Sequence, residues 1–379
     1  MSREGRKRLS CLLALNREKA AFPRAKKFSQ GLTIFGGSEN GSPSRYSNFA
    51  THRSLDSWPA LHHSGMRVLI TGGAGFIGRH IAEHFHDRAE VRVLDNLRSG
   101  FKSNLSELDC QLIVGSILDR DLVREAMKDV DFVFHLAAMV SVQESVQKPN
   151  ECTEINTGGT TIVLEEAARA RVKKLIFSSS AAIYGDNPTI PKIESMPAEP
   201  KSPYATSKYE AELNCRSFTN EGRLATVALR YFNVFGPYQV PGSRYTAAVP
   251  AFIEKAIRNE PITIFGDGRQ TRDLIYVKDV IAANAFFALK SQATGVFNVA
   301  CGRQITITDL ALTIRSLTKS SSTIDYGAER PGDVKHSVAG VDKIQTAGFR
   351  PLCDLAGGLR ATIEFFKKDK AAIEQGRHV

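Results

Sequence analysis

One tyrosine and one lysine in this chain have the spacing that acid–base chemistry on a helix requires. Among the nine tyrosines, only Tyr204 is followed four residues later by a lysine, Lys208. On a helix this spacing places both side chains on one face. A phenol has a pKa near ~10, so a base at neutral pH needs it lowered by about 3 units, which a neighbouring ammonium group could partly supply. A surface tyrosine beside a solvated lysine is the alternative interpretation.

A run of serines, Ser178–Ser180, ends an apolar segment that is predicted to be a strand. The hydroxyl of Ser180 is therefore expected where that strand opens into a crevice, within reach of the same substrate oxygen as Tyr204. A serine-rich loop without a chemical role is the alternative.

Three regularly spaced glycines follow the first predicted strand. Gly72, Gly75 and Gly78 fit the pattern G-x-x-G-x-x-G. The first allows a tight turn, the second lets the backbone approach a pyrophosphate, and the third lets a helix pack on the strand. Asp95 ends the next predicted strand, where a carboxylate binds ribose hydroxyls and repels a 2′-phosphate. The pattern predicts an NAD site; a glycine turn without a ligand is the alternative, and nearby Arg98 is interpreted as a solvated loop residue.

Alternating short strands and amphipathic helices must position these residues. The alternation predicts an α/β fold with a Rossmann-type doubly wound parallel sheet, whose ligand crevice lies at the carboxyl ends of the strands. The irregular, glycine- and proline-rich pattern after Asn233 predicts a smaller α/β substrate-binding domain. The predicted strands are Arg67–Ile70, Glu90–Leu94, Leu112–Val114, Phe132–Leu136 and Lys174–Ser178, and the predicted helices are Phe76–Phe85, Asp119–Lys128, Thr157–Ala170 and Ala205–Glu221. The segments Tyr276–Lys290 and Val296–Ala300 are predicted to return to the sheet.

The chain of 379 residues is predicted to divide at Met66. Residues 1–65 hold eleven Lys/Arg and four Asp/Glu, lack sustained periodicity and are predicted to be a basic, disordered extension. A mispredicted start, an organelle transit peptide and a nucleic-acid-binding arm stay open as interpretations. The NAD-binding domain is predicted over 66–233 and about 274–303, and the substrate-binding domain over 234–273 and about 304–379. The extension accounts for most of the net charge of +10, so no nucleic acid is expected as a partner of the body.

Six cysteines are scattered through the chain without C-x-x-C spacing. This distribution argues against a zinc site and a disulfide scaffold and for a reducing compartment, so a cytoplasmic location and no metal are predicted. No apolar run approaches the ~20 residues that a membrane helix needs, so no membrane partner is expected.

Together, these motifs make the chain similar to the extended short-chain dehydrogenase/reductase family, and within it to the UDP-hexose 4-epimerases. The resemblance implies that Tyr204 takes the proton of the sugar 4-hydroxyl, that Lys208 and the positive nicotinamide assist it, and that Ser180 bonds the same oxygen. Tightly bound NAD is then reduced and regenerated through a 4-keto intermediate. The matching stretches are Thr71–Gly78, Leu136–Ala138, Asn156, Ser178–Gly185, Ser202–Lys208, Leu229–Gly236, Ile264–Val277 and Arg330–Ser337.

The resemblance also implies binding residues for the cofactor and for a nucleotide sugar. Ser116 stands where the family usually has an aspartate that binds adenine, so weaker adenine binding is expected. Ser337 stands where some members have a tyrosine that excludes a 2-acetamido group, so N-acetylhexosamine substrates are expected as well. The implied NAD residues are Gly72, Gly75, Phe76, Ile77, Gly78, Asp95, Asn96, Ser116, Ile117, Leu136, Ala137, Ala138, Asn156, Tyr204, Lys208 and Tyr231, and the substrate residues are Ser180, Tyr204, Asn233, Ala248, Val249, Arg272, Arg330, Asp333 and Ser337.

The reaction predicted from this resemblance is C4 epimerisation of UDP-glucose and UDP-galactose, and also of UDP-GlcNAc and UDP-GalNAc. Relatives that dehydrate or decarboxylate nucleotide sugars carry an acidic residue just after the catalytic hydroxyl, where this chain has Ala181 and Ala182. A UDP-glucuronate 4-epimerase, a nucleotide-sugar reductase and, more distantly, a non-catalytic dinucleotide-sensing or RNA-binding protein are the alternatives. The resemblance further implies a homodimer that pairs helices Thr157–Ala170 and Ala205–Glu221.

Overall fold

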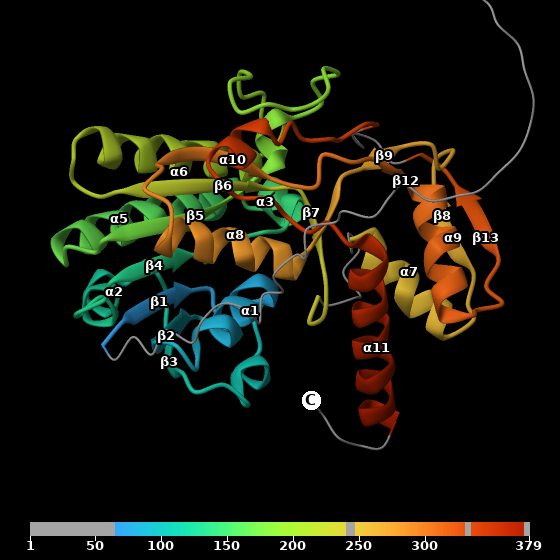
Figure 1. Ribbon diagram of the computed structural model, residues 1–379, viewed down its shortest axis with the longest axis horizontal. Helices are drawn as coiled ribbons and strands as arrows, with labels where there is room; N and C mark the ends of the chain where they lie inside the picture. The colour runs from blue at the N-terminus through green and yellow to red at the C-terminus, as the bar shows by residue number, and fades with distance from the viewer. Residues whose placement is uncertain (1–64, 240–246, 330–334, 375–379) are drawn as a thin grey trace, which may run out of the picture. The chain divides into compact units, whose positions relative to one another are not determined.

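The computed structural model describes residues 65–239, 247–329 and 335–374, with side chains as far as residue 368 (Figure 1). All of these residues belong to one unit of the chain, Arg53–Val379. The predicted basic extension, except for Gly65, lies outside the described residues, so its interpretations stay predictions.

Seven parallel strands form the central sheet, in the order β11-β6-β5-β4-β1-β2-β3. Their short apolar runs are typical of parallel strands that are covered on both faces. The direction of winding reverses at β1, which lies between β2 and β4, and this switch point is where such folds bind ligands. The predicted doubly wound fold is confirmed. The strands are β1 (Arg67–Thr71), β2 (Glu90–Asp95), β3 (Gln111–Val114), β4 (Phe132–His135), β5 (Lys174–Ser180), β6 (Thr226–Tyr231) and β11 (Gly295–Val299).

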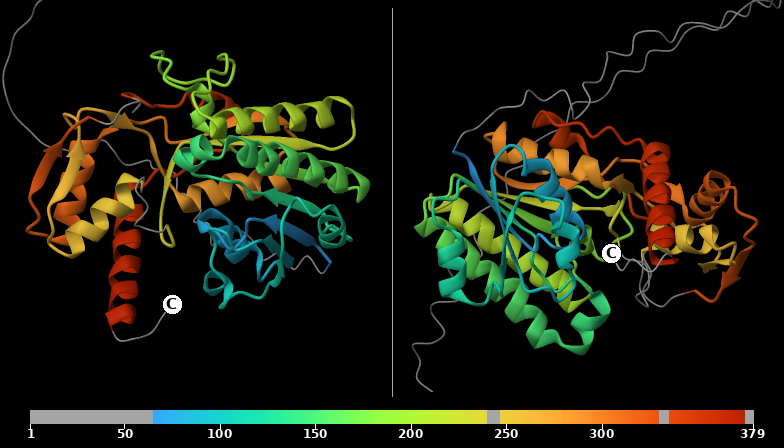
Figure 2. Two further views of the ribbon diagram at one scale, coloured as in Figure 1. Left: turned by 180° about the vertical axis from the view of Figure 1, so that it is seen from behind. Right: turned by 90° about the horizontal axis from the view of Figure 1, so that it is seen from below.

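Helices cover both faces of this sheet, as the right-hand view of Figure 2 shows. Helices α1 (Phe76–Phe85) and α8 (Val277–Leu289) share a hydrophobic cluster with Val68 and Ile70 of β1. On the other face, α2 (Arg120–Ala126), α5 (Thr160–Arg169) and α6 (Pro203–Asn220) share a second cluster with Leu69. The alternation of Val68, Leu69 and Ile70 between the clusters follows the two-residue period of a strand.

A third hydrophobic cluster lies among the elements that come mainly after β6. It joins the side chains of helices that were predicted to belong to a substrate-binding domain; the boundary of that domain stays a prediction. The elements of this part are β7 (Asn233–Phe235), α7 (Ala248–Ile257), β8 (Ile262–Phe265), β9 (Thr271–Arg272), β10 (Leu274–Tyr276), β12 (Ile305–Thr306), α9 (Ile307–Thr318), β13 (Ile324–Gly327), α10 (Asp342–Thr346) and α11 (Leu355–Glu374). Small two-stranded sheets pair β7 with β10, β9 with β12 and β8 with β13.

The helix predicted over Thr157–Ala170 begins differently from the prediction. Residues Glu154–Gly159 form a π-helix, and α5 starts only at Thr160. Two consecutive glycines here are weak formers of an α-helix, and π turns are frequent near functional sites. The remaining short elements are η2 (Lys102–Leu105), α3 (Val142–Gln147), α4 (Pro149–Thr153) and η4 (Ala181–Tyr184).

Cys301 and Cys353 form a disulfide bond, with their Cα atoms 5.6 Å apart. The cysteine distribution, which argued against a disulfide scaffold, did not predict this bond. Spacing along the chain did not reveal it because 52 residues separate the two cysteines, and only the fold brings the end of β11 next to the start of α11. Cysteine usage thus no longer supports a reducing compartment.

No helix in the described part of the chain has the length and hydropathy needed to cross a lipid bilayer. Within residues 65–239, 247–329 and 335–374, no three His, Cys, Asp or Glu side chains come together as a set of metal ligands.

Candidate active site

A cavity of about 460 Å³ lies at the carboxyl ends of the central strands, next to the switch point. It brings together the three predicted catalytic residues and all but one of the residues predicted to hold NAD. The predicted residues that line it are Gly72, Gly75, Phe76, Ile77, Gly78, Asp95, Asn96, Ser116, Ile117, Leu136, Ala137, Ala138, Ser180, Tyr204, Lys208 and Tyr231.

The glycine loop at one end of this cavity leaves no room for a side chain at Gly72 or Gly78. A Cβ atom on Gly78 would lie 2.3 Å from the carbonyl oxygen of Gly72, and one on Gly72 would lie 2.7 Å from the nitrogen of Ala137. Gly72 also has a φ of +72°, which L-residues rarely adopt. The loop leads into α1, whose first turn presents unpaired N–H groups to the cavity, as a pyrophosphate requires.

The carboxylate of Asp95 is held at the wall of the cavity by two backbone N–H groups. Ala74 N donates to Oδ2 at 2.9 Å, and Leu97 N donates to Oδ1 at 2.8 Å. A carboxylate oxygen can accept a second hydrogen bond, so both oxygens keep a lone pair for ribose hydroxyls. The glycine cradle and this carboxylate together fit NAD.

Arg98 also lines the cavity, and it is an exposed loop residue, as the sequence predicted, but its charge is paired. Its guanidinium pairs with Glu144 at 2.6 Å and with Glu151 at 2.5 Å. Because two carboxylates already neutralise it, Arg98 is poorly placed to attract a 2′-phosphate, which agrees with NAD rather than NADP.

Helix α6 begins one residue before the predicted catalytic tyrosine. The Ser202 hydroxyl accepts from Ala205 N at 3.2 Å, and Pro203 occupies the first helical position. Both are strong start signals, since serine caps a free N–H group and proline needs no partner there. This start fixes Tyr204 in the first turn, with Lys208 one turn later.

Tyr204 is half-buried, and its phenol lies beside Ser180. Burial raises the pKa of Tyr204, and hydrogen bonding to Ser180 opposes this rise. The chain's own residues therefore do not lower the pKa of Tyr204, because the loss of hydration outweighs the stabilising contacts. The lowering by the ammonium together with the positive nicotinamide of bound NAD stays a prediction.

Lys208 is buried below the same part of the cavity. Its Nζ donates to the carbonyl oxygen of Ser178 at 2.8 Å and lies 4.9 Å from the centre of the Phe177 ring. Burial lowers the pKa of Lys208 to about 8. An ammonium group has three donors, so two are left for the cavity side.

Asn156 lies behind the cavity and not on its wall. Its Oδ1 accepts from Met139 N at 2.7 Å, and its Nδ2 donates to Ser207 Oγ at 3.0 Å. The π-helix places Asn156 in this buried position. Its side chain thus joins the loop after β4 to α6. Asn156 does not line the cavity, although it was predicted to contact NAD.

A buried histidine that the sequence analysis missed continues this network. His135 Nδ1 lies 2.6 Å from Thr71 Oγ1, and Nε2 lies 2.9 Å from Thr160 Oγ1. Since the Thr160 hydroxyl donates to the Asn156 carbonyl oxygen, it must accept from Nε2–H, and Nδ1 must accept from Thr71. Burial lowers the pKa of His135 to about 3, which keeps this neutral form. Like Ser180, it is a polar residue that ends an apolar strand, and that signal could have identified it.

Tyr238 was also missed, and it closes one side of the cavity. Its hydroxyl accepts from Arg79 Nη2 at 2.9 Å, and the Arg79 guanidinium lies 3.9 Å from its ring centre. The Phe365 ring of α11 packs against it. The other lining residues that were not predicted for the site are Leu94, Ser99, Phe101, Asn104, Gly115, Met139, Val140, Ile155, Ser178, Ser179 and Phe232.

Three predicted substrate residues lie outside this cavity but gather around the segment Thr271–Asp273. Asn233 N and Nδ2 both donate to the Asp273 carbonyl oxygen at 3.2 Å. Arg272 belongs to the segment itself, and Ser337 N donates to the Thr271 carbonyl oxygen at 3.2 Å. The fold therefore joins residues that are about one hundred positions apart in the sequence.

The other predicted substrate residues are not gathered with them. Ala248 and Val249 form the first turn of α7 and pack into the third hydrophobic cluster. Arg330 and Asp333 lie outside the described residues.

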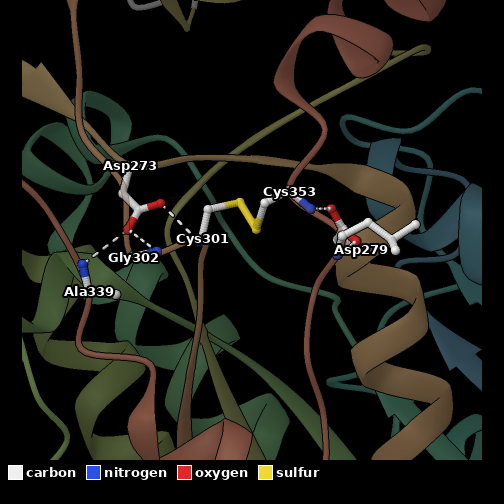
Figure 3. The surroundings of a disulfide bond; sticks show 7 residues. Asp273, Asp279, Cys301, Gly302, Ala339 and Cys353 are labelled. Atoms are coloured by element: carbon white, nitrogen blue, oxygen red, sulfur yellow. Dashed lines mark hydrogen bonds between the residues drawn. A yellow bond between two sulfur atoms is a disulfide. The ribbon is translucent and has the colours of Figure 1, made fainter. Parts of the chain in front are cut away.

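The disulfide stands beside Thr271–Asp273, between two buried carboxylates (Figure 3). Asp273 accepts from Cys301 N at 2.9 Å, and Asp279 of α8 accepts from Cys353 N at 3.1 Å. The backbone of each cysteine is thus anchored to the segment that runs from β9 through β10 into α8.

Comparisons with known proteins agree with this site. Residues 68–300 match the model of the NAD dependent epimerase/dehydratase family. A putative UDP-glucose 4-epimerase of Methanocaldococcus jannaschii is 33% identical, over 80% of this chain and 99% of the relative. The solved UDP-N-acetylglucosamine 4-epimerase of Methanobrevibacter ruminantium, in complex with UDP-N-acetylmuramic acid, is 40% identical over 80% of this chain and 99% of its own, with a TM-score of 0.78.

A UDP-glucose 4-epimerase of Thermus thermophilus, solved with NAD, is 35% identical over 80% of this chain and 99% of its own, with a TM-score of 0.73. Relatives named as dTDP-D-glucose 4,6-dehydratases and as a UDP-N-acetyl-alpha-D-glucosaminuronate decarboxylase also match. NAD is the cofactor of this group, as the cavity predicts. The glycine loop, the Asp95 carboxylate and these matches agree, and the chain belongs to the NAD dependent epimerase/dehydratase family.

Proposed function

We propose that this chain is a UDP-sugar 4-epimerase that interconverts UDP-glucose with UDP-galactose and UDP-GlcNAc with UDP-GalNAc. One observation carries the choice within the family. Asp95 is the only carboxylate that lines the cavity among the described residues, and it is bonded to the glycine loop. A carboxyl group that could act as an acid for eliminating a sugar hydroxyl is therefore not found beside Ser180 and Tyr204.

The residues after Ser180 support the same choice. Ala181 and Ala182 begin the short helix η4, and Ala182 N donates to Ser180 Oγ at 3.1 Å. That bond fixes the Ser180 hydroxyl, while methyl groups stand where dehydrating relatives carry an acid. The chain can hold a sugar oxygen here but has nothing to protonate a leaving group.

The chain's own groups then act on the sugar 4-hydroxyl. The phenolate form of Tyr204, which the positive nicotinamide of bound NAD would favour, takes its proton, and Ser180 donates a hydrogen bond to the same oxygen, which orients C4. Lys208 keeps a positive charge next to the phenolate and ties β5 to α6 through Ser178. Bound NAD supplies the acceptor and donor of the hydride at C4. The 4-keto sugar must turn its other face toward the cofactor before the hydride and the Tyr204 proton return, which inverts C4. Because the hydride goes back to the sugar, no external oxidant or reductant is needed.

For the substrate, we propose that Arg272 and Asn233 contact the diphosphate and that Ser337 leaves room for a 2-acetamido group. Support for this comes from their gathering around Thr271–Asp273 and from the two kinds of 4-epimerase among the relatives. Arg330 and Asp333 are proposed to join them at the diphosphate and the uridine ribose.

The test is incubation of the purified protein, without added cofactor, with UDP-GlcNAc or UDP-glucose, followed by NMR. We expect the 4-epimer of each and no NADH in solution. A 4-keto-6-deoxy product, or turnover that depends on added NAD, would overturn the proposal. Turnover of UDP-glucuronate alone would move the assignment to that substrate.

The Ser337 assignment has a separate test. We expect Ser337→Tyr to lower kcat/KM for UDP-GlcNAc by about 100-fold, because the ring fills the space of the acetamido group, and to leave UDP-glucose turnover within a few fold. Equal losses on both substrates would show that Ser337 does not select the substrate.

A further inference from the structure

A fully buried aspartate lies at the junction between β9 and β10. The Oδ1 of Asp273 accepts from Cys301 N at 2.9 Å, and its Oδ2 accepts from Gly302 N at 2.9 Å and from Ala339 N at 3.1 Å. Figure 3 shows the carboxylate pointing into the space between these segments. One side chain thus holds the loop after β11 and the segment that follows Ser337.

The backbone of Asp273 extends this set of contacts. Its carbonyl oxygen accepts from the backbone and side-chain nitrogens of Asn233. Asp273 also follows Arg272 directly, and the preceding Thr271 carbonyl oxygen accepts from Ser337 N. Each predicted substrate residue in this group is therefore connected to Asp273 through a hydrogen bond or through neighbouring residues of the backbone.

Burying the charged carboxylate of Asp273 costs free energy, because the charge loses its hydration. Burial raises the pKa of Asp273 to about 6, although several backbone N–H groups bond to it. A neutral side chain would avoid the cost of desolvating a charge, but would not accept three N–H groups at once.

We propose that Asp273 is a positioning residue for the nucleotide sugar: it fixes Asn233, Arg272 and Ser337 relative to one another without touching the reacting atoms. The proposal rests on the proposed function for its substrate. It predicts that Asp273 governs affinity for the nucleotide part, while the chemistry at Tyr204 and the binding of NAD are independent of it.

The test compares Asp273→Asn with Asp279→Asn. The amide has the same shape, but its NH2 group faces N–H donors, so at least one of the three bonds is lost. Asp279 is the matched control, because it is a buried carboxylate beside the same disulfide that accepts from Leu352 N and Cys353 N but holds no predicted substrate residue. We expect Asp273→Asn to raise KM at least tenfold with kcat within about threefold and the bound NAD unchanged. Asp279→Asn should leave KM within twofold.

Calorimetry with UDP as the ligand separates this proposal from the proposed function. If the protein does not epimerise UDP-sugars but binds UDP, Asp273→Asn should still lower the affinity for UDP by tenfold or more. Unchanged UDP affinity, or an equal loss in Asp279→Asn, would overturn the role of Asp273.

Hydrogen exchange of the unsubstituted protein keeps the proposal testable if Asp273→Asn does not fold. UDP should slow exchange in the peptides that contain Cys301, Gly302 and Ala339, because their N–H groups bond to Asp273. Unchanged exchange at saturating UDP would contradict the proposal.

Discussion

The Tyr204 phenol is the residue on which the proposed proton transfer depends. We expect Tyr204→Phe to lower kcat by about 10²–10⁴-fold, the usual contribution of a positioned acid or base. The ring stays in place, so NAD should be retained and the fold unchanged. Single-turnover rates measure the loss of catalysis, and the absorbance of bound cofactor measures the retention of NAD. Turnover within tenfold of the original enzyme would remove Tyr204 from its proposed role.

Lys208 gives a pH-dependent prediction for stability in the cofactor-free protein. Its pKa is lowered from 10.5 to about 8 by burial, so the charged form is favoured in the unfolded chain. The folded state therefore bears a penalty below about pH 8, which disappears as pH rises toward 10.5. We expect Lys208→Met to raise the free energy of unfolding at pH 7 by on the order of 2–3 kcal/mol.

The measurement is urea unfolding of both proteins at pH 7 and above pH 10. The difference between them should shrink steadily as pH rises from 8 toward 10.5, because Lys208 is then neutral in the folded state and progressively loses its proton in the unfolded chain. A difference that does not depend on pH would show that packing, and not charge, separates the two proteins.

Single residues could be predicted from sequence where one local element decides their position. Tyr204 and Lys208 lie one helical turn apart, and Ser180 ends a strand that points at the cavity. Asn156 was placed less well, because no local signal distinguishes a π turn from an α turn. Tyr238 reaches the cavity through contacts with Arg79 and Phe365, which are distant in sequence.

At the scale of elements, strand β6 and helix α6 are joined by a buried ion pair. Arg230 donates to Glu212 at 2.9 Å from Nε and at 2.7 Å from Nη2, and both side chains are almost fully buried. Glu212 also accepts from the Ser179 hydroxyl, next to Ser180. This pair aligns the end of β5 with the helix that carries Tyr204.

We expect Glu212→Gln to lower the free energy of unfolding by about 3–5 kcal/mol, because it leaves the Arg230 charge buried without a counter-ion. Denaturant unfolding measures the loss. Glu125→Gln is the control: its partner Lys128 and Glu125 are both mostly exposed, so the change there should stay below about 1 kcal/mol. Equal effects in the two variants would contradict the importance of burial.

Six of the seven central strands lie within two residues of a segment predicted for the sheet, because these segments read as short apolar runs. Strand β6 was missed although it is fully buried, since Thr226, Arg230 and Tyr231 interrupt its apolar pattern. The small sheets after β6 were not predicted, since strands such as β9 and β12 contain two residues each and depend on partners far along the chain.

At the scale of the whole molecule, the assembly predicted from the resemblance stays a prediction. Among the described residues, the large apolar side chains that are well exposed do not lie on α5 or α6; Val142 and Val146 lie on the neighbouring helix α3. The predicted homodimer therefore rests on the resemblance, and the cytoplasmic location has lost its support from the cysteines.

The disulfide gives a prediction for the stability of the whole unit. A bond across 52 residues restricts the unfolded chain, and we expect Cys353→Ser to lower the free energy of unfolding by about 2–4 kcal/mol. A reductant should lower the stability of the unsubstituted protein by a similar amount and leave the variant unchanged. A reductant that acts equally on both proteins would show that the bond does not contribute.

The same bond changes what a break in the backbone would do. Any single cut between Gly302 and Leu352 leaves two fragments that sulfur still joins, so the nicked protein keeps its full mass until a thiol reagent is added. New chain ends could therefore be introduced in this interval, for a tag or for circular permutation, without separating the helix α11 that packs against Tyr238 from the rest of the enzyme.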